Sequence, residues 1–96
     1  MRQYYVYILS SGVRGYLYTG VTNNLGRRIC EHKESFINSY TKRYNIKNLV
    51  YYEIFEDINL AINREKTIKK WRRNIKFEAI ERFNPVWKDL YFELNK

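Results

Sequence analysis

The stretch that decides the fold reads Tyr16-Leu17-Tyr18-Thr19-Gly20-Val21-Thr22-Asn23-Asn24-Leu25-Gly26-Arg27-Arg28-Ile29-Cys30-Glu31-His32. Its first residues are mostly strand-forming types. Residues 22–24 supply turn and N-cap chemistry, and Leu25, Ile29 and Phe36 then recur at helical spacing. The stretch therefore predicts a strand, a tight turn and a helix.

Three reactive side chains fall close together within this stretch. Tyr18 would sit near the end of the strand, and Arg28 and His32 are four residues apart in the helix that follows. Residues at this spacing share one ridge of a helix and project together, whereas Arg27 points about 100° away. We therefore expect a phenol, a guanidinium and an imidazole to face one small space.

The remaining strands are indicated by apolar and β-branched runs. These runs predict strands over residues 4–9 and 49–55, in addition to the strand over residues 16–21. Residues 12–15 read as a hairpin loop, which would pair the first two strands antiparallel.

Helical spacing and breaker residues indicate the helices. Helices are expected over about residues 24–34, 58–73 and 75–82, and Pro85 prevents the last from continuing. Residues 35–48 are polar and basic and read as a long loop, with or without a short helical turn. The apolar residues expected to pack back on the body after Pro85 are Trp87, Leu90, Tyr91 and Phe92. The pattern predicts a fold that contains both helices and strands, of the α+β class.

Length and composition indicate one small, basic domain over residues 1–96. The net charge is +8 and aromatic residues make up 18% of the chain, which suits a polyanion such as nucleic acid, although many small basic proteins share this charge. Cys30 is the single cysteine, which excludes an internal disulfide and fits a reducing compartment. Without a signal peptide or a bilayer-spanning run, the sequence predicts a soluble, cytoplasmic protein and no membrane partner.

The basic residues gather in two separate segments. Residues 26–47 carry six Lys or Arg against two acids, and residues 64–76 carry seven against one, whereas residues 48–63 have three acids and no base. This alternation predicts one positive face built from two segments. The side chains expected to bind phosphates, and so to set affinity and salt dependence rather than turnover, are Lys33, Lys42, Arg43, Lys66, Lys69, Lys70, Arg72, Arg73 and Lys76.

One carboxylate interrupts the apolar stripe of the long predicted helix. The stripe contains Ala61, Ile68, Trp71 and Ile75, and Glu65 falls in its middle. Burying a charge is costly unless the charge is paired or bound to a metal. Glu65 could form a salt bridge with Arg28 or a nearby lysine, point to solvent, or serve a site.

The other candidate residues also have ordinary structural explanations. Tyr7 and Tyr18 could be amphipathic core residues with wet hydroxyls, and His32, the single histidine, could be structural. Arg28 could be one more solvated cation on a basic helix. A catalytic tyrosine must lose its proton near neutral pH, although the reference pKa is ~10, and nearby cations favour that loss.

Taken together, these residues resemble the GIY-YIG endonuclease superfamily, and within it the small, single-domain bacterial branch. The resemblance covers about residues 4–92. Its motifs, in chain order, are Tyr5-Val6-Tyr7, Tyr18-Thr19-Gly20, the helix with Leu25, Arg28 and His32, the acidic helix with Arg64-Glu65-Lys66 and Trp71, and Asn84-Pro85 with Trp87. The chain departs from the family pattern at Tyr5, in place of glycine, and at Thr19, in place of isoleucine; Gly20 is kept where close backbone approach is needed.

The resemblance implies a small three-stranded antiparallel sheet flanked by three or more helices. It also implies a metal-dependent DNA endonuclease that acts on branched or damaged DNA in repair or recombination, needs no obligate protein partner and prefers DNA to RNA. The implied catalytic residues are Tyr7, Tyr18, Arg28, His32, Glu65 and Asn84.

The same resemblance implies a role for each of these residues. Tyr18, directly or through His32, would accept the proton of the attacking water, and Arg28 would stabilise the scissile phosphate. Glu65 would hold one Mg²⁺ or Mn²⁺, bound with the substrate, and Asn84 would be a supporting polar group.

Two other functions fit the same composition. The chain could be a non-catalytic accessory protein that binds nucleic acid on a nuclease scaffold, or a ribosome- or RNA-associated basic protein. Divalent-dependent nicking separates the endonuclease from both, and a preference for RNA over DNA separates the last two.

Overall fold

Three antiparallel strands form the central sheet. In the computed structural model, which describes residues 2–34 and 39–94, β1 (Tyr4–Ser10) lies between β2 (Leu17–Thr22) and β3 (Asn48–Phe55). β1 pairs antiparallel with both neighbours, so β2 and β3 are the two edges of the sheet. The α+β class and the three-stranded antiparallel sheet expected from the sequence are confirmed.

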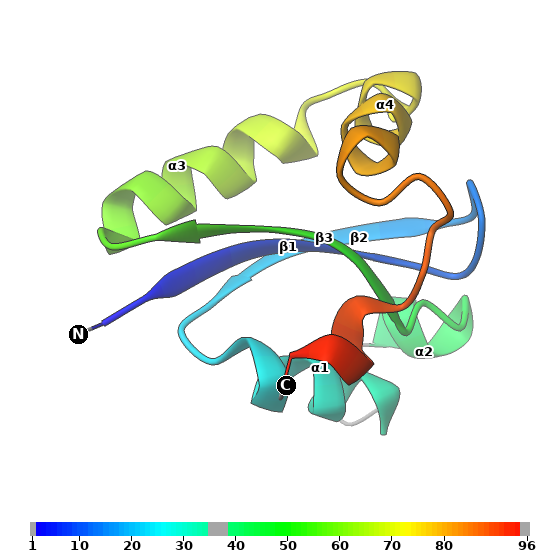
Figure 1. The fold of residues 1–96 in the computed structure, drawn as a ribbon, viewed down its shortest axis with the longest axis horizontal. Helices are drawn as coiled ribbons and strands as arrows, with labels where there is room; N and C mark the ends of the chain where they lie inside the picture. The colour runs from blue at the N-terminus through cyan, green and yellow to red at the C-terminus, as the bar shows by residue number, and fades with distance from the viewer. Residues whose placement is uncertain (1, 35–38, 95–96) are drawn as a thin grey trace.

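Helices cover both faces of this sheet (Figure 1). α3 (Ile58–Lys69) and α4 (Arg73–Phe83) lie above it in that view, and α1 (Leu25–Lys33), α2 (Ser39–Arg43) and the short 3₁₀ helix η1 (Leu90–Glu93) lie below it. Within the described residues, no helix combines the length and the apolar character needed to cross a membrane.

Alternate residues of β1 point to opposite faces of the sheet and build two cores. Val6 and Ile8 face α3 and α4, and their core contains Val50, Tyr51, Ala61, Ile68, Ile80 and Trp87. Tyr7 and Leu9 face α1, and their core contains Leu25, Ile29, Ile46 and Leu49. The chain therefore places its phenol-bearing motif residue, Tyr7, on the side of α1.

The strand, turn and helix predicted from the opening stretch are confirmed. Asn24 caps α1, since its side-chain oxygen accepts a hydrogen bond from the Arg27 backbone N–H at 3.1 Å. Thr22 prepares this turn by accepting the Asn24 backbone N–H at 3.1 Å. α2 is the short helical turn that the basic loop allowed, whereas Phe36 lies outside the described residues.

α3 ends earlier than the sequence predicts. One helix was expected to run as far as Arg73, but α3 stops at Lys69 and α4 begins at Arg73. The break at residues 70–72 contains no Gly or Pro, and Ile68 and Ile80 on either side of it are fully buried in one core. The restart also changes the inward face, so Ile75, expected on the buried stripe, is 40% exposed.

The turn between β1 and β2 is fastened to α4. Arg14 donates two hydrogen bonds to the Glu81 carboxylate at 2.8 and 2.9 Å, and the Trp87 indole N–H donates to the same carboxylate at 2.8 Å. These bonds, with Arg14 first, lower the pKa of Glu81 to about 2. Arg73 in turn donates to the carbonyl oxygens of Arg14 and Gly15 at 3.1 and 2.7 Å. The position of the turn is thus set by α4.

The C-terminal tail packs back on the body only in part. Trp87 is buried, and Leu90 and Tyr91 are partly buried against the core on the α1 side. Phe92, which the sequence also placed against the body, is 70% exposed. The tail therefore leaves one large aromatic side chain in solvent.

Candidate active site

A buried chain of polar groups joins β1, α1 and α2. The Tyr7 hydroxyl lies 3.1 Å from His32 Nε2, and His32 Nδ1 lies 3.4 Å from Thr41 Oγ1. All three residues are 1% exposed. His32 points at the sheet because it shares the buried face of α1 with Leu25 and Ile29. Sequence reasoning missed Thr41, which no motif or spacing links to His32.

Tyr7 reaches His32 by passing over the backbone of Gly20. The two residues are direct partners in the β1–β2 ladder. A Cβ atom on Gly20 would lie 2.4 Å from the Tyr7 hydroxyl oxygen, closer than real Cβ contacts come. The phenol of the first motif therefore requires the glycine of the second, as expected from close backbone approach.

Tyr18 lies against the same imidazole. Its ring centroid is 5.2 Å from that of His32 and 6.4 Å from that of Tyr7. Tyr18 is partly exposed, so it is the phenol that solvent reaches, whereas Tyr7 is buried. The role that the resemblance gives Tyr18, accepting a proton directly or through His32, stays a prediction. The hydrogen bond of His32 Nε2 is shared with the Tyr7 hydroxyl.

Burial keeps both members of the buried pair uncharged. Desolvation, assisted by the nearby Arg28 charge, lowers the pKa of His32 to about 4. Desolvation also raises the pKa of Tyr7 well above its usual value; Tyr18 and Glu65 act in the same direction and Arg28 opposes them. At neutral pH the imidazole is therefore uncharged, and Arg28 and Glu65 both influence the pKa of the Tyr7 phenol.

The side chains of Arg28 and Arg27 differ in solvent exposure, as their positions on the helix predict. The Arg28 side chain is 36% exposed and that of Arg27 is 60% exposed. Arg28 Nε is buried and has no hydrogen-bond partner among the described residues, with Glu31 Oε1 3.5 Å away. A buried guanidinium N–H that lacks a hydrogen-bond acceptor is costly in the free protein and is suited to donate to an anionic ligand.

Glu65 projects from α3, which packs on both β1 and β2. Its side chain is 14% exposed and forms a salt bridge with Lys69, with 2.9 Å between Oε2 and Nζ. This is the pairing with a neighbouring lysine that the sequence left open, and Lys69 itself is 52% exposed. Because Glu65 also contributes to the raised pKa of Tyr7, the carboxylate acts on the cluster formed by β1, β2 and α1.

The side chains of this cluster supply few ligands for a magnesium-type ion. Among residues 2–34 and 39–94, no group of three or more His, Cys, Asp or Glu gathers to hold a metal ion. Mg²⁺ needs few protein ligands, since it keeps several waters and takes substrate phosphate oxygens. Glu65, nearly buried and next to a displaceable lysine, is compatible with one such ion bound together with a phosphate.

Asn84 is not brought into this cluster. Its amide nitrogen donates to the carbonyl oxygens of Val50 and Lys88 at 3.2 and 2.7 Å, and its amide oxygen accepts the Lys88 backbone N–H at 3.1 Å. These bonds tie the end of α4 to β3, at the sheet edge opposite β2. The observed contacts are structural, and a role for Asn84 in catalysis stays a prediction.

The predicted phosphate-binding side chains divide into two groups. Lys33 is committed to structure, since its ammonium contacts Asp89 at 2.5 Å and the Lys47 carbonyl oxygen at 3.0 Å. Arg73 and Lys69 are held by the β1–β2 turn and by Glu65. The exposed ones without an ion pair in the described part of the chain are Lys42, Arg43, Lys66, Lys70 and Arg72.

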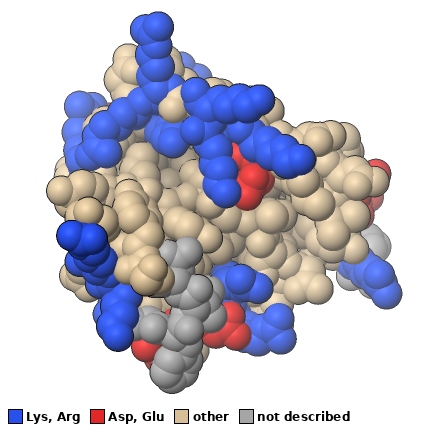
Figure 2. Space-filling view, turned by 180° about the vertical axis from the view of Figure 1, so that it is seen from behind, with Lys and Arg blue, Asp and Glu red and all other residues tan. Residues whose placement is uncertain are grey.

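The basic side chains frame one face of the molecule. Figure 2 shows a dense group of Lys and Arg at the top, on the side of α3 and α4, and smaller groups at the bottom. Largely uncharged surface lies between them, with acidic side chains among the basic ones. This arrangement agrees with a positive face built from two segments.

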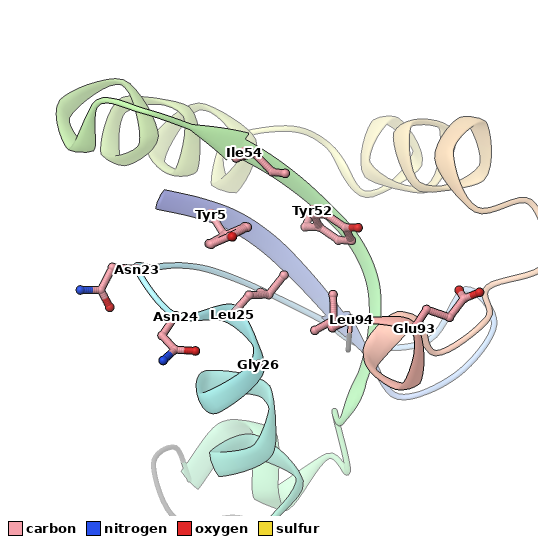
Figure 3. A pocket seen from close by; sticks show the side chains of 9 residues that line it. All are labelled: Tyr5, Asn23, Asn24, Leu25, Gly26, Tyr52, Ile54, Glu93 and Leu94. Carbon is pink, nitrogen blue, oxygen red and sulfur yellow. The ribbon is translucent and has the colours of Figure 1, made fainter. Parts of the chain in front are cut away.

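A separate pocket lies on the α1 side of the sheet, between the start of α1 and the C-terminal tail (Figure 3). Sequence reasoning did not indicate it. Its lining contains none of the predicted catalytic residues and consists of Tyr5, Asn23, Asn24, Leu25, Gly26, Tyr52, Ile54, Glu93 and Leu94. This pocket is therefore distinct from the cluster around His32.

Comparison with known proteins gives consistent results. The model of the GIY-YIG catalytic domain matches residues 3–79, which include every predicted catalytic residue except Asn84. UPF0213 protein CPE1444 of Clostridium perfringens is 45% identical over 76 residues, covering 79% of this chain and 81% of that protein. UPF0213 protein SH2523 of Staphylococcus haemolyticus is 38% identical over 81 residues, covering 84% of this chain and 98% of that protein.

A solved structure agrees with the sequence relatives. The solution NMR structure of UPF0213 protein BH0048 from Bacillus halodurans is similar with a TM-score of 0.51 and 30% identity, covering 82% of this chain and 83% of that one. The family model, the relatives and the fold all cover most of the chain. The chain therefore belongs to the GIY-YIG family and carries its catalytic domain, that of a family of nucleases.

Proposed function

We propose that this protein is a divalent-metal-dependent endonuclease that hydrolyses phosphodiester bonds in DNA. The observation that carries the proposal is the gathering of four kinds of group around β2. A buried phenol–imidazole pair, a second phenol and a guanidinium come from β1, β2 and α1, and a carboxylate comes from α3. These are the groups that phosphodiester hydrolysis needs for proton transfer, charge stabilisation and metal binding.

Arg28 would bind the scissile phosphate. Its Nε is buried without a hydrogen-bond partner among the described residues, and its planar fork suits two phosphate oxygens. Arg28 would therefore stabilise the negative charge that develops on the phosphoryl group.

Glu65 would hold one Mg²⁺ or Mn²⁺ together with the substrate. Such an ion supplies charge neutralisation at a phosphate oxygen. The ammonium of Lys69, which is half exposed, would leave the carboxylate and turn to solvent or to the DNA backbone. Since Glu65 is the single carboxylate that we assign, we expect weak metal binding in the absence of DNA.

Tyr18 would take the proton of the attacking water. It is the accessible phenol of the pair, and its ring lies against that of the neutral His32. In this step Tyr18 would act as the phenolate, after its own proton has left to solvent. The water oxygen forms the new bond to phosphorus as a water proton passes to the phenolate oxygen, and the leaving sugar oxygen keeps the electron pair of the broken bond and takes a proton from solvent. Tyr7 and Thr41 would hold the imidazole in place on its two nitrogen atoms.

The test uses the wild-type protein and four labelled DNAs: linear duplex, single strand, flap and four-way junction. Each is incubated with Mg²⁺, Mn²⁺ or EDTA, and binding in EDTA is measured separately. An RNA duplex and an RNA flap of the same sequences are the controls for DNA preference. Cleavage of DNA with either metal and none in EDTA is expected.

The other outcomes identify the rival functions. Binding of all DNAs without cleavage under any metal would contradict the endonuclease and support an accessory protein that binds nucleic acid. Tighter binding of RNA than of DNA would contradict the DNA preference and support an RNA-associated protein. Branched or damaged DNA as the natural substrate is part of the proposal, and faster cleavage of flap or junction than of linear duplex is expected from it.

A further inference from the structure

Three tyrosines form an exposed cluster beside the candidate active site, which we call the aromatic platform: Tyr16, Tyr40 and Tyr44. The Tyr16 and Tyr44 ring centroids are 4.7 Å apart, and those of Tyr40 and Tyr44 are 5.1 Å apart. Tyr16 is 51% exposed and Tyr40 is 43% exposed. Tyr44 is partly buried and contacts both of the other rings, so Tyr16 and Tyr40 are the members of the cluster that solvent reaches most.

The platform adjoins the catalytic cluster on two elements. Tyr16 directly precedes β2 and is two residues from Tyr18, so the two side chains lie on the same face of this edge. Tyr40 lies on α2 next to Thr41, which contacts the imidazole of His32, and Tyr44 directly follows this helix. A nucleotide on the platform would therefore lie next to a phosphate bound in the site.

Two arginines, Arg43 and Arg73, lie beside the platform. Lys42 and Arg43 are exposed on α2, and the Arg43 guanidinium lies 5.5 Å from the centre of the Tyr44 ring. Arg72 is exposed at the start of α4, and Arg73 is bonded to the turn just before Tyr16. In Figure 1 this turn lies between α4 above and α2 below.

We propose that the aromatic platform binds an unpaired nucleobase next to the scissile phosphate. Aromatic faces stack on bases of any sequence, and flanking cations follow the backbone of a single strand. A base inside a duplex is already stacked on its neighbours and cannot present its face. The substrate would therefore carry unpaired nucleotides beside the cleaved bond, as a flap or an opened junction does.

This inference rests on the proposed function for the position of the cleaved bond, but base stacking can be tested without cleavage. The probes are a single-stranded oligothymidylate with one 2-aminopurine and a blunt DNA duplex, both in EDTA. The proteins are wild type, Tyr16→Ala, Tyr16→Phe and Tyr16→Leu. Phe92→Ala is the matched control, because Phe92 is an exposed aromatic residue on the C-terminal tail, away from the platform.

We expect Tyr16→Ala to weaken single-strand binding about 10-fold, within the range of one lost base–aromatic stack, and duplex binding less than twofold. Tyr16→Phe should bind like wild type and quench 2-aminopurine equally. Tyr16→Leu keeps apolar packing against Tyr44 but lacks a π face, so it should lose affinity like the alanine variant. Phe92→Ala should bind both probes like wild type.

Two results would contradict the proposal that the aromatic platform binds an unpaired nucleobase. One is equal loss of single-strand and duplex binding by Tyr16→Ala, which would indicate a general change in the protein. The other is unchanged single-strand binding by a folded Tyr16→Leu variant. Loss of single-strand binding in a protein that never cleaves DNA would support the platform while contradicting the endonuclease, so the two proposals fail separately.

Discussion

The two faces of the sheet hold their polar side chains in opposite ways. On the α1 side, Tyr7, His32 and Thr41 are 1% exposed and joined through both nitrogens of the imidazole. On the α3 side, Glu65 is held by Lys69, an ion pair with one half-exposed partner. The first arrangement is fixed by the fold, whereas the second can open without disturbing the core.

This difference indicates how the two sides would divide the chemistry. Buried, hydrogen-bonded groups are already placed before substrate arrives, so little reorganisation is needed during the reaction. Because Lys69 is half exposed, its ammonium can leave Glu65 for solvent and give way to a metal ion and a phosphate. We infer that the α1 side is ready in the free protein and that the α3 side is completed by the substrate.

The largest effect is expected on the α3 side. Glu65→Ala should abolish cleavage and leave DNA binding largely unchanged, because the carboxylate would be the ligand of the metal. Glu78→Ala, which removes an exposed acid of α4, is the matched control and should cleave like wild type. Cleavage rates with Mg²⁺ and Mn²⁺ electron paramagnetic resonance with uncleavable DNA give two readouts. Unchanged cleavage by Glu65→Ala would refute the metal role.

The second-largest effect is expected from replacing Tyr18, the accessible phenol. Tyr18→Phe should lower the cleavage rate about 10²- to 10⁴-fold without unfolding the protein, since a general base contributes rate enhancement of that size. Tyr7→Phe instead leaves His32 Nε2 buried without its hydrogen bond and should lower the free energy of unfolding by about 1–3 kcal/mol. Rates and chemical denaturation measure the two effects. Full activity of Tyr18→Phe would remove this phenol from the mechanism.

The two neighbouring arginines of α1 sharpen the comparison further. Arg28→Ala should lower the single-turnover cleavage rate about 10²- to 10³-fold, as loss of a charge-stabilising donor does. Arg27→Ala should change it little, because the side chain points away and is 60% exposed. Equal losses in both variants would mean that α1 presents a different face to the DNA.

Lowering the pH should destabilise the folded protein through His32, on the α1 side of the sheet. Burial lowers the pKa of His32 to about 4, whereas an unfolded histidine titrates near ~6.5, so the unfolded state binds the proton first as pH falls. The free energy of unfolding should therefore decrease from about pH 6.5 down to about pH 4. His32→Gln, which cannot titrate, should show a smaller decrease in thermal melts over this range. Parallel pH profiles for both proteins would contradict a buried neutral imidazole.

The smallest effect is expected from the exposed cations. Lys70→Ala should weaken binding about equally for all DNA sequences and reduce the slope of log K against log salt by about 1. Lys88→Ala is the control, because Lys88 is paired with Glu93 at 3.1 Å. Binding titrations at several salt concentrations measure both slopes. An equal change in the two slopes would show that the α3–α4 side has no special role in holding DNA.

The parts of the fold that depend on local sequence could be predicted. The cap at Asn24, the buried spacing of Leu25 and Ile29, and the relative facing of Arg27 and Arg28 all follow from residues a few positions apart. Helical periodicity and capping chemistry act over that range, so the strand, turn and helix were within reach of sequence reasoning.

The rest depends on contacts between distant residues. Lys33 looked like a phosphate ligand, but Asp89, fifty-six positions later, captures its ammonium. Thr41 joins His32 only because α2 lies on the α1 side of the sheet, and α3 ends at Lys69 rather than at Arg73 in a fold that buries Ile68 and Ile80 in one core. Such pairings are set by tertiary packing, which no local pattern reports.

The most direct test of the central claim uses a closed circular plasmid with an inverted repeat that extrudes a four-way junction. A closed circle has no ends, so only an endonuclease converts it to open or linear DNA. Wild type with Mg²⁺ is expected to do so, while wild type in EDTA and Glu65→Ala with Mg²⁺ leave the circle closed. Equal conversion by Glu65→Ala, or a circle that stays closed with wild type and Mg²⁺, would contradict the assignment.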